Sequence, residues 1–348
     1  MKKTPVIIGV GIALLLVIAI PAYILFAPAT SFEEKTKSFI IETNKNTNDE
    51  VVELLKSKEI ISNGWAFSLL ANQLKVWNKL KPGKFEVKKG DNLLGIVRLL
   101  RNNTQSQVKL VINKIRTNED LAKLIGKNFS TDSATVMAFL SSNDSLKPFG
   151  IDSNNVMQLV IPNTNSFYWA TPLAKILNRL KTESDAFWNS ENRREKAKSL
   201  GFTPQEIYIF SSIVEEETNM QDDKGKIGSV YMNRFHKGMN LGADPTVKFA
   251  LKDFSLKRIL YQHLTVVSPY NTYHNKGLPP GPICTPSANT IDAVLNAPAT
   301  DYLFFVAKAD FSGYSNFSNN FATHSQYAKQ YQKALNEYLL RKQAAANK

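Results

Sequence analysis

The chain has 348 residues, of which 43% are hydrophobic, enough for two or three folded domains with sizeable cores. Its 10% aromatic and 21% charged residues exclude a wholly disordered chain. The formal net charge of +13 comes from scattered Lys and Arg, which favours attraction to anionic lipid headgroups or carboxylate-bearing polymers over nucleic acid. A general solubility charge is the alternative. The single cysteine, Cys284, excludes an intramolecular disulfide and a cysteine metal cluster.

An uncharged apolar run from Pro5 to Ala27 follows two lysines at the N-terminus. The run is about 23 residues long, enough to span about 30 Å of hydrocarbon with some tilt. Because it is longer than the apolar core of a signal peptide and ends in bulky residues, we expect an uncleaved membrane anchor. A cleaved signal peptide and a buried core helix are the alternatives. Lys2 and Lys3 favour a cytoplasmic N-terminus, with the rest of the chain outside the cytoplasm.

After a polar linker, the pattern predicts a small βα module. The expected elements are a strand at 38–42, helices at 48–55 and 65–74, a strand at 85–87 and an apolar-faced helix after Gly90-Asp91. The segment from Lys84 to Leu93, with the helix behind it, resembles a LysM-like glycan-binding module. A generic strand–turn–helix unit is the alternative.

The remaining residues predict a larger mixed domain, so the fold class expected for the whole chain is α+β. Strands are expected at 108–112 and 302–307, and helices at 118–125, 133–141, 174–188, 191–199 and 288–295. Residues 159–169 are expected to form a Pro/Asn-rich loop ending in three aromatics, and residues 239–247 a turn fixed by Pro245. The predicted domains are residues 1–30 (cytoplasmic tip and anchor), 31–112 (LysM-like module), 113–342 (catalytic domain) and 343–348 (polar tail).

Three adjacent carboxylates end a predicted helix that begins at Pro204. Residues two apart on a helix point about 200° apart, so Glu215 and Glu217 cannot share a face. We therefore expect at least one of the three carboxylates to point inward. Burial against apolar surface raises the pKa of a carboxyl, which suits a general acid near neutral pH. A solvated acidic helix end is the alternative.

The segments that follow carry a recognisable set of motifs. In chain order they are Ile213-Val214-Glu215-Glu216-Glu217-Thr218, Asn233-Arg234, Asp244-Pro245-Thr246-Val247, Tyr270-Asn271-Thr272-Tyr273, Gly277-Leu278-Pro279-Pro280-Gly281 and His324. This set resembles the endolytic murein transglycosylases of the MltG/YceG-like family. The order of anchor, LysM-like region and catalytic domain also resembles the family layout.

The resemblance implies a lyase that cleaves the MurNAc–GlcNAc β-1,4 bond of peptidoglycan without water. One Glu protonates the leaving oxygen, and the 6-hydroxyl of the sugar closes on the anomeric carbon to give a 1,6-anhydro end. In the family the catalytic Glu directly precedes Ser or Thr, which maps to Glu217 before Thr218. An intramolecular hydroxyl removes the need for the second carboxylate of a typical glycosidase, and we expect no cofactor. The implied location is the cytoplasmic membrane, and the implied partners are glycan strands and peptidoglycan synthases.

The resemblance also gives eight supporting or substrate-binding candidates: Glu215, Thr218, Asn233, Asp244, Tyr270, Asn271, Tyr273 and His324. Several have structural alternatives: Asn233 and Asp244 could fix loops, and His324 could be a structural histidine. Glu216 is expected to be solvated. Ala243 and Asn163 depart from the residues typical of the family at these positions.

Two other functions compete with the transglycosylase. A hydrolytic muramidase would need a second carboxylate facing Glu217, for which Asp244 is the candidate. A degenerate, non-catalytic domain would leave a peptidoglycan-binding scaffold. The four histidines have no HExxH spacing, and the sequence has no GxGxxG or P-loop motif, so metal and nucleotide enzymes are disfavoured.

Overall fold

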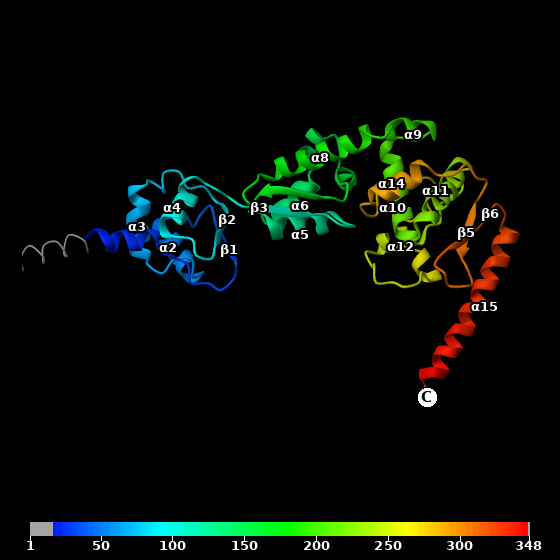
Figure 1. Cartoon of the computed structure of the whole chain (residues 1–348). Coiled ribbons are helices and arrows are strands. Elements are labelled where there is room, and N and C mark those ends of the chain that lie inside the picture. The colour runs from blue at the N-terminus through cyan, green and yellow to red at the C-terminus, as the bar shows by residue number, and fades with distance from the viewer. Residues whose placement is uncertain (1–16, 347–348) are drawn as a thin grey trace, which may run out of the picture. The chain divides into compact units, whose positions relative to one another are not determined.

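The structure is a computed structural model that describes residues 17–346 (Figure 1). The chain divides into two compact units. The first contains the described residues through Leu110, with Asn128–Thr131 and Asn165–Pro172, and the second contains the other described residues. The mixture of helices with small two-stranded sheets confirms the α+β class.

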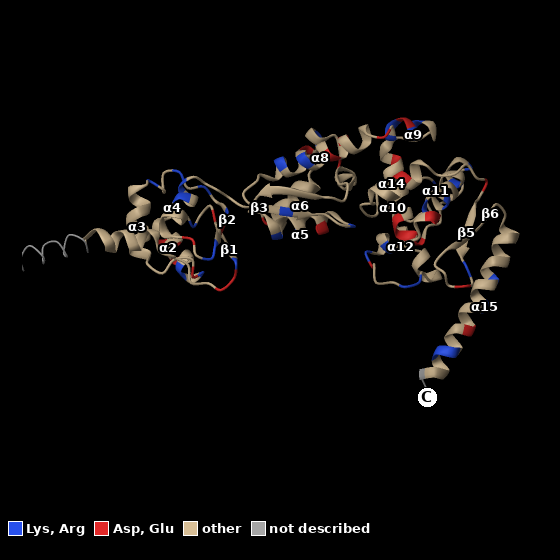
Figure 2. Ribbon diagram, viewed as in Figure 1, with Lys and Arg blue, Asp and Glu red and all other residues tan. Residues whose placement is uncertain are grey.

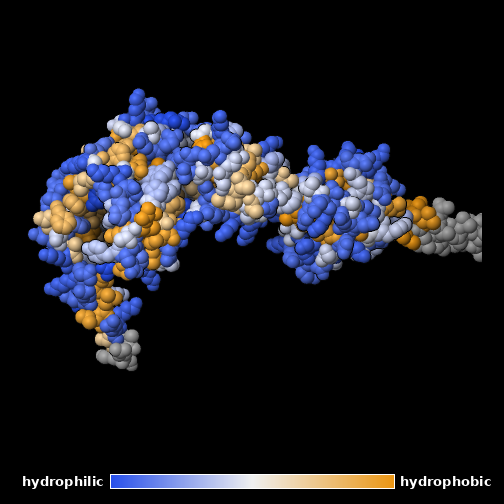
Figure 3. All heavy atoms as spheres, turned by 180° about the vertical axis from the view of Figure 1, so that it is seen from behind, coloured by the Kyte–Doolittle hydropathy of each residue, from blue (hydrophilic) through white to orange (hydrophobic). Residues whose placement is uncertain are grey.

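The N-terminal helix covers residues 17–26, and hydrophobic side chains gather there on the surface (Figure 3). No helix within residues 17–346 has both the length and the apolar character needed to cross a membrane. Much of the predicted anchor, residues 5–16, lies outside the described residues.

The first unit is built on an antiparallel strand pair, β1 (Thr36–Ile41) and β2 (Gly83–Lys88). Phe39 faces Phe85 across the pair, and their rings stack with centroids 5.6 Å apart. Alternate residues of β2 are buried, as expected for a sheet with one face on a core. Three helices complete the unit: α2 (Asn48–Ser57), α3 (Gly64–Gln73) and α4 (Leu93–Arg101).

A second strand pair joins β3 (Gln107–Val111) to β4 (Thr164–Tyr168). The prediction of a loop throughout residues 159–169 is therefore wrong. Asn165 and Phe167 are buried while their neighbours are exposed, so the period of two outweighs the Pro/Asn content.

The second unit is mainly helical. Its early elements are α5 (Asn118–Asn128), α6 (Ser133–Ser141), α7 (Asn143–Leu146), η1 (Lys147–Phe149), η2 (Val156–Leu159), α8 (Leu173–Asn189) and α9 (Arg193–Ser199). Its later elements are α10 (Pro204–Glu217), α11 (Gln221–His236), α12 (Asp244–Leu251), α13 (Tyr261–Leu264), α14 (Ala288–Leu295), β5 (Phe304–Ala307), β6 (Ser315–Ser318) and α15 (Phe321–Ala346). Helix α10 packs against α11, α12 and α14 and forms the centre of the core (Figure 1).

Two predictions for the second unit need correction. Residues 239–247 do not all form a turn, because α12 begins at Asp244, with Pro245 in its first turn, where a missing N–H costs no helical bond. The C-terminal helix α15 was not predicted, and it continues through Ala346 into the predicted polar tail. It starts beside β5 and β6 (Figure 1).

Candidate functional site

Helix α10 fixes the three carboxylates. Thr203 caps its N-terminus by accepting the Glu206 backbone N–H, while the Glu206 side chain accepts the Thr203 N–H, and Pro204 follows at the first helical position. All eight residues from Ile207 to Val214 are buried. A helix buried all round is held by neighbours on every side, so its last residues emerge among several elements in fixed directions.

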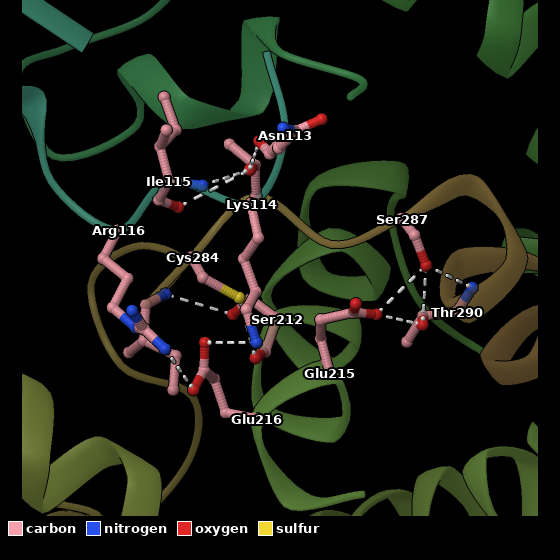
Figure 4. A network of polar contacts seen from close by, with 12 residues as sticks. Asn113, Lys114, Ile115, Arg116, Ser212, Glu215, Glu216, Cys284, Ser287 and Thr290 are labelled. Atoms are coloured by element: carbon pink, nitrogen blue, oxygen red, sulfur yellow. Dashed lines mark hydrogen bonds and ion pairs between the residues drawn. The ribbon is translucent and has the colours of Figure 1, made fainter. Parts of the chain in front are cut away.

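Glu215 faces α11 and α14. Its Oε2 accepts hydrogen bonds from Lys224 Nζ at 3.2 Å, from Ser287 Oγ at 3.1 Å and from Thr290 Oγ1. Figure 4 shows this carboxylate pointing toward Ser287 and Thr290. Glu215 therefore ties α10 to its neighbouring helices.

Glu216 points to the segment before α5. Its carboxylate pairs with Lys114 Nζ at 3.1 Å and Arg116 Nη2 at 3.0 Å (Figure 4). Only 16% of its side chain is exposed, so the prediction of a solvated Glu216 is wrong. The two cations could not be predicted as partners of Glu216, because they lie about 100 residues away in the chain.

Glu217 turns inward toward α11, where the Tyr231 hydroxyl donates a hydrogen bond of 2.5 Å to its Oε1. Burial is the main cause that raises the pKa of Glu217 to about 7. The Tyr231 hydrogen bond stabilises the carboxylate and so opposes this rise in pKa. The expectation that Glu215 and Glu217 face different ways is confirmed. A pKa of about 7 is what a general acid needs at neutral pH.

Charges around Glu217 adjust its protonation. The negative charge of Asp244 raises the pKa of Glu217, while Lys248 and Arg234 lower it. Asp244 and Lys248 both lie on α12 and Arg234 lies on α11. Figure 2 shows acidic residues gathered where α10 approaches α12. The pKa of Glu217 thus depends on three elements meeting at one place.

Asp244 is exposed and accepts a hydrogen bond of 2.6 Å from the Tyr273 hydroxyl. Burial, and then Asp244, raise the pKa of Tyr273, so its hydroxyl stays protonated and donates. Gly242 has a φ of +59°, a backbone conformation that residues with a side chain rarely adopt, so a substitution at this turn would be strained. The turn thereby brings Asp244, Tyr273 and Arg234 to the same region as Glu217.

Arg234 and His324 both contact the ring of Phe304, the first residue of β5. Arg234 donates to the backbone oxygens of Leu303 and Leu241, and its guanidinium lies 5.3 Å from the centroid of the Phe304 ring. His324 stacks on the same ring at 5.2 Å. Burial first, and then the charge of Arg234, lower the pKa of His324, which keeps the imidazole neutral at pH 7.

The other candidates hold the backbone. Asn271 is buried, donates to the backbone oxygens of Leu264 and Val266 and accepts the Tyr273 N–H. Asn233 donates to the backbone oxygens of Thr300 and Tyr302. These two amides shape the loops that carry Tyr273 and β5.

Thr218 and Tyr270 also lie outside the hydrogen-bonded group around Glu217. Thr218 is the C-cap residue that follows α10, and its Oγ1 accepts the Met220 N–H at 3.0 Å. Tyr270 packs on Phe249 with ring centroids 4.6 Å apart. The structure therefore brings Glu217, Asp244 and Tyr273 together, with His324 connected through Phe304 and Arg234.

Sequence reasoning missed Tyr231 and Lys248 as contributors to the site. Tyr231 lies among the buried positions of α11, so its ring belongs to the core while its hydroxyl reaches the site. A tyrosine in a core-facing register is a usable signal, since a buried hydroxyl needs a polar partner. Within residues 17–346 no group of three or more His, Cys, Asp or Glu side chains could hold a metal ion.

Comparison with known proteins places the chain in a family. The profile of the YceG-like family matches residues 39–330. An endolytic murein transglycosylase of Bacillus subtilis is 34% identical over 167 residues, which are 48% of this chain and 45% of that protein. A Streptococcus pneumoniae protein of the same name is 28% identical over 171 residues, 48% of this chain and 30% of that protein.

The matched segment thus spans less than half the length of these curated relatives. A crystal structure of a yceG-like protein from Listeria monocytogenes aligns with a TM-score of 0.56 and 25% identity, covering 84% of this chain and 99% of that one. The family match covers most of the chain and includes α10, α11, α12 and His324. The chain belongs to the YceG-like family.

Proposed function

We propose that the protein is an endolytic lytic transglycosylase that cleaves the MurNAc–GlcNAc β-1,4 bond of peptidoglycan strands. The observation that carries the proposal is the half-buried Glu217, whose pKa is raised to about 7 and whose Oε1 accepts the Tyr231 hydroxyl. The relatives named endolytic murein transglycosylases support the reaction class.

In the proposed reaction, the protonated Glu217 donates its proton to the glycosidic oxygen as the bond to the anomeric carbon breaks. The 6-hydroxyl oxygen of MurNAc then bonds to that carbon, and its proton passes to the Glu217 carboxylate. One bond breaks, one forms and the acid is regenerated, so no water is consumed. The single carboxyl is sufficient because the attacking group is already part of the substrate.

Neighbouring residues have positioning roles in this proposal. Tyr231 holds one carboxyl oxygen, which directs the other toward the substrate, and it stabilises the carboxylate formed after proton transfer. Tyr273 is our candidate for contact with the sugar. Its hydroxyl donates a hydrogen bond to Asp244, and the charge of Glu217 acts on it.

The new glycan ends test the reaction. The full-length chain and its Glu217→Gln variant are incubated with un-crosslinked glycan strands, and the products are weighed by mass spectrometry. Ends lighter by one water, absent with the variant, support the transglycosylase. If folded protein binds the strands but makes no new ends, the enzyme reading is abandoned and a binding scaffold remains.

A hydrolytic muramidase is the second candidate, because the charge of Asp244 acts on Glu217. In that reaction Asp244 would activate water or attack the anomeric carbon, and ordinary reducing ends would appear. Asp244→Asn separates the two. If the wild-type protein makes reducing ends by hydrolysis and Asp244→Asn abolishes them, the muramidase is favoured. If Asp244→Asn still makes 1,6-anhydro ends, the transglycosylase is favoured.

We also propose that the chain is a single-pass protein of the cytoplasmic membrane, with its N-terminus inside and its catalytic unit outside. The uncharged run from Pro5 to Ala27 supports this location, and strand–helix–helix–strand order in the first unit supports a LysM-like role in strand binding. Anchoring beside peptidoglycan synthases would let the enzyme release or terminate nascent strands. The full chain should stay in salt-washed membranes and be cut by protease added from the outer face; digestion from the inner face alone contradicts the topology.

A further inference from the structure

Two small adjoining cavities lie in the second unit, and Arg116 lines both. The larger, about 200 Å³, is lined by Asn118, Phe249, Lys252 and Tyr270 among others. The smaller, about 40 Å³, lies between Arg116, Glu216, Lys248 and Phe254. We call the pair the Arg116 cavities. Neither includes Glu217, but both adjoin elements that carry the proposed acid and its neighbours.

The Arg116 guanidinium is partly unused as a hydrogen-bond donor. Its Nη2 donates to Glu216 at 3.0 Å, and its carbon lies 4.8 Å from the centroid of the Phe254 ring. Its Nε is buried and has no hydrogen-bond partner among the described residues. A guanidinium close to an aromatic ring and with an unused N–H donor is suited to binding a planar carboxylate.

The cavities carry more positive than negative charge. Glu216 faces two cations at once, Lys114 and Arg116 (Figure 4). Lys248 makes no hydrogen bond or ion pair with another described residue, although its charge acts on Glu217. Lys252 pairs with Glu119 at 3.1 Å on the surface. Lys248 is therefore a cation that lines the smaller cavity without an ion-pair partner among the described residues.

A neutral sugar chain does not account for this charge. The glycan backbone carries no charge, whereas peptide stems on alternate sugars bring carboxylates and amides into the same substrate. The larger cavity combines cations with the side-chain amide of Asn118 and the rings of Phe249 and Tyr270, which suits a short peptide. Lys248 joins the two sites, because it lines the smaller cavity and lowers the pKa of Glu217.

We propose that the Arg116 cavities bind a carboxylate of the peptide stem on the glycan strand, next to the bond that Glu217 cleaves. The inference rests on the proposed function for the identity of the polymer. Arg116 and Lys248 bind the carboxylate, and the aromatic rings of Phe249 and Tyr270 contact the peptide. Recognition of the stem then selects which glycosidic bonds enter the site.

Binding to three matched strand preparations tests the inference. The full-length Glu217→Gln protein, which cannot consume the strands, is titrated with strands bearing native stems, strands whose stem carboxylates are amidated, and strands freed of peptide by an amidase, which keep only the lactyl carboxylate of each MurNAc. We expect the native stems to bind about tenfold more tightly than either of the others. Equal affinities for all three overturn the proposal.

Variants of Arg116 and Lys248 test whether the preference for native stems arises at the Arg116 cavities. Adding Arg116→Gln or Lys248→Gln to the Glu217→Gln protein should bring the ratio of the affinity for native strands to the affinity for amidated strands close to one. Lys248→Gln covers the case in which Arg116→Gln fails to fold, since the Lys248 side chain makes no hydrogen bond or ion pair with another described residue. Lys198→Gln, an exposed lysine on α9 that lines neither cavity, is the matched control and should keep the full ratio.

The same strands separate this inference from the proposed function. If the wild-type chain forms 1,6-anhydro ends equally well with native and peptide-free strands, the stem site is wrong and the enzyme stands. If it forms no new ends with any strand while the binding preference persists, the cavities bind stems but the proposed activity fails. A preference that survives both cavity variants places stem recognition elsewhere and overturns the assignment.

Discussion

Glu217 has neighbours that act on its pKa in opposite directions. The hydrogen bond from Tyr231 favours the carboxylate, whereas burial and the charge of Asp244 favour the protonated acid. Burial is the largest effect and raises the pKa of Glu217 to about 7, so a substantial part of the acid keeps its proton at neutral pH. A general acid that later accepts a proton benefits from a pKa near the working pH, because both forms are then accessible.

The raised pKa makes stability depend on pH. Below about pH 4.5 Glu217 is protonated in both folded and unfolded states, and as pH rises through about 7 the folded state loses stability because it holds the proton more tightly. Glu217→Gln should therefore raise the free energy of unfolding by about 1–3 kcal/mol at pH 8.5 and change it little at pH 4.5. Urea unfolding at both values measures this difference; a gap that does not vary with pH would contradict the assignment.

Tyr231→Phe should raise the pKa of Glu217 further, since it removes a hydrogen bond to the carboxylate. The alkaline limb of the activity profile should move to higher pH, and kcat should fall because the carboxyl loses its orientation.

Asp244→Asn removes a negative charge near Glu217 and should move the alkaline limb of the activity profile to lower pH. Opposite shifts identify electrostatic control of Glu217. Equal losses at every pH in both variants would indicate general structural damage instead.

At the scale of elements, α10 determines where the carboxylates lie. Its capping box at Thr203 sets its start, and burial of Ile207 to Val214 fixes its rotation. Glu215 and Glu216 then hold its end to α14 and to the segment before α5, leaving Glu217 for the site. Adjacent residues of one helix end thus have structural and chemical roles that differ because their faces differ.

Thr203→Ala should lower the free energy of unfolding by about 1 kcal/mol, because the Glu206 N–H loses its cap and the capping box is broken. Denaturant unfolding measures the loss. Thr203→Ser keeps the side-chain oxygen and should stay close to wild type. If the two variants lose equal stability, the methyl group of Thr203 and not its hydroxyl stabilises the helix.

At the scale of the whole molecule, the chain has separate hydrophobic cores. One gathers Phe39, Phe85 and the inner faces of α2, α3 and α4, and the other surrounds α10. Separate cores in separate compact units are expected to unfold as separate cooperative transitions.

Calorimetry of the full chain should therefore show two transitions. Phe85→Ala, a fully buried truncation in the first unit, should lower the midpoint of one of them, at a cost of about 3–5 kcal/mol. Ile213→Ala in the second unit should lower the other. A single transition, or equal shifts of both midpoints by either variant, would show that the two units unfold together.

Much of this architecture could be predicted from the sequence because its signals are local. Apolar periodicity located α6 and α14 at the observed bounds, and the acidic run at the end of α10 marked the candidate acid. The α+β class followed from the same local patterns. The error at β4 arose where turn-forming residues occur in a strand whose pairing partner, β3, lies about 50 residues earlier.

Contacts between distant segments decided the rest. The sequence by itself determined that three adjacent carboxylates end an apolar helix and that Glu215 and Glu217 lie on different faces of it, since helical geometry fixes their relative directions. The tertiary structure alone decided which one, because Tyr231, Asp244 and Lys248 meet Glu217 through packing of α11 and α12 against α10. It also decided that Glu216 is paired, since Lys114 and Arg116 reach it from far along the chain. A pKa depends on burial and on charges nearby in space, and sequence spacing specifies neither.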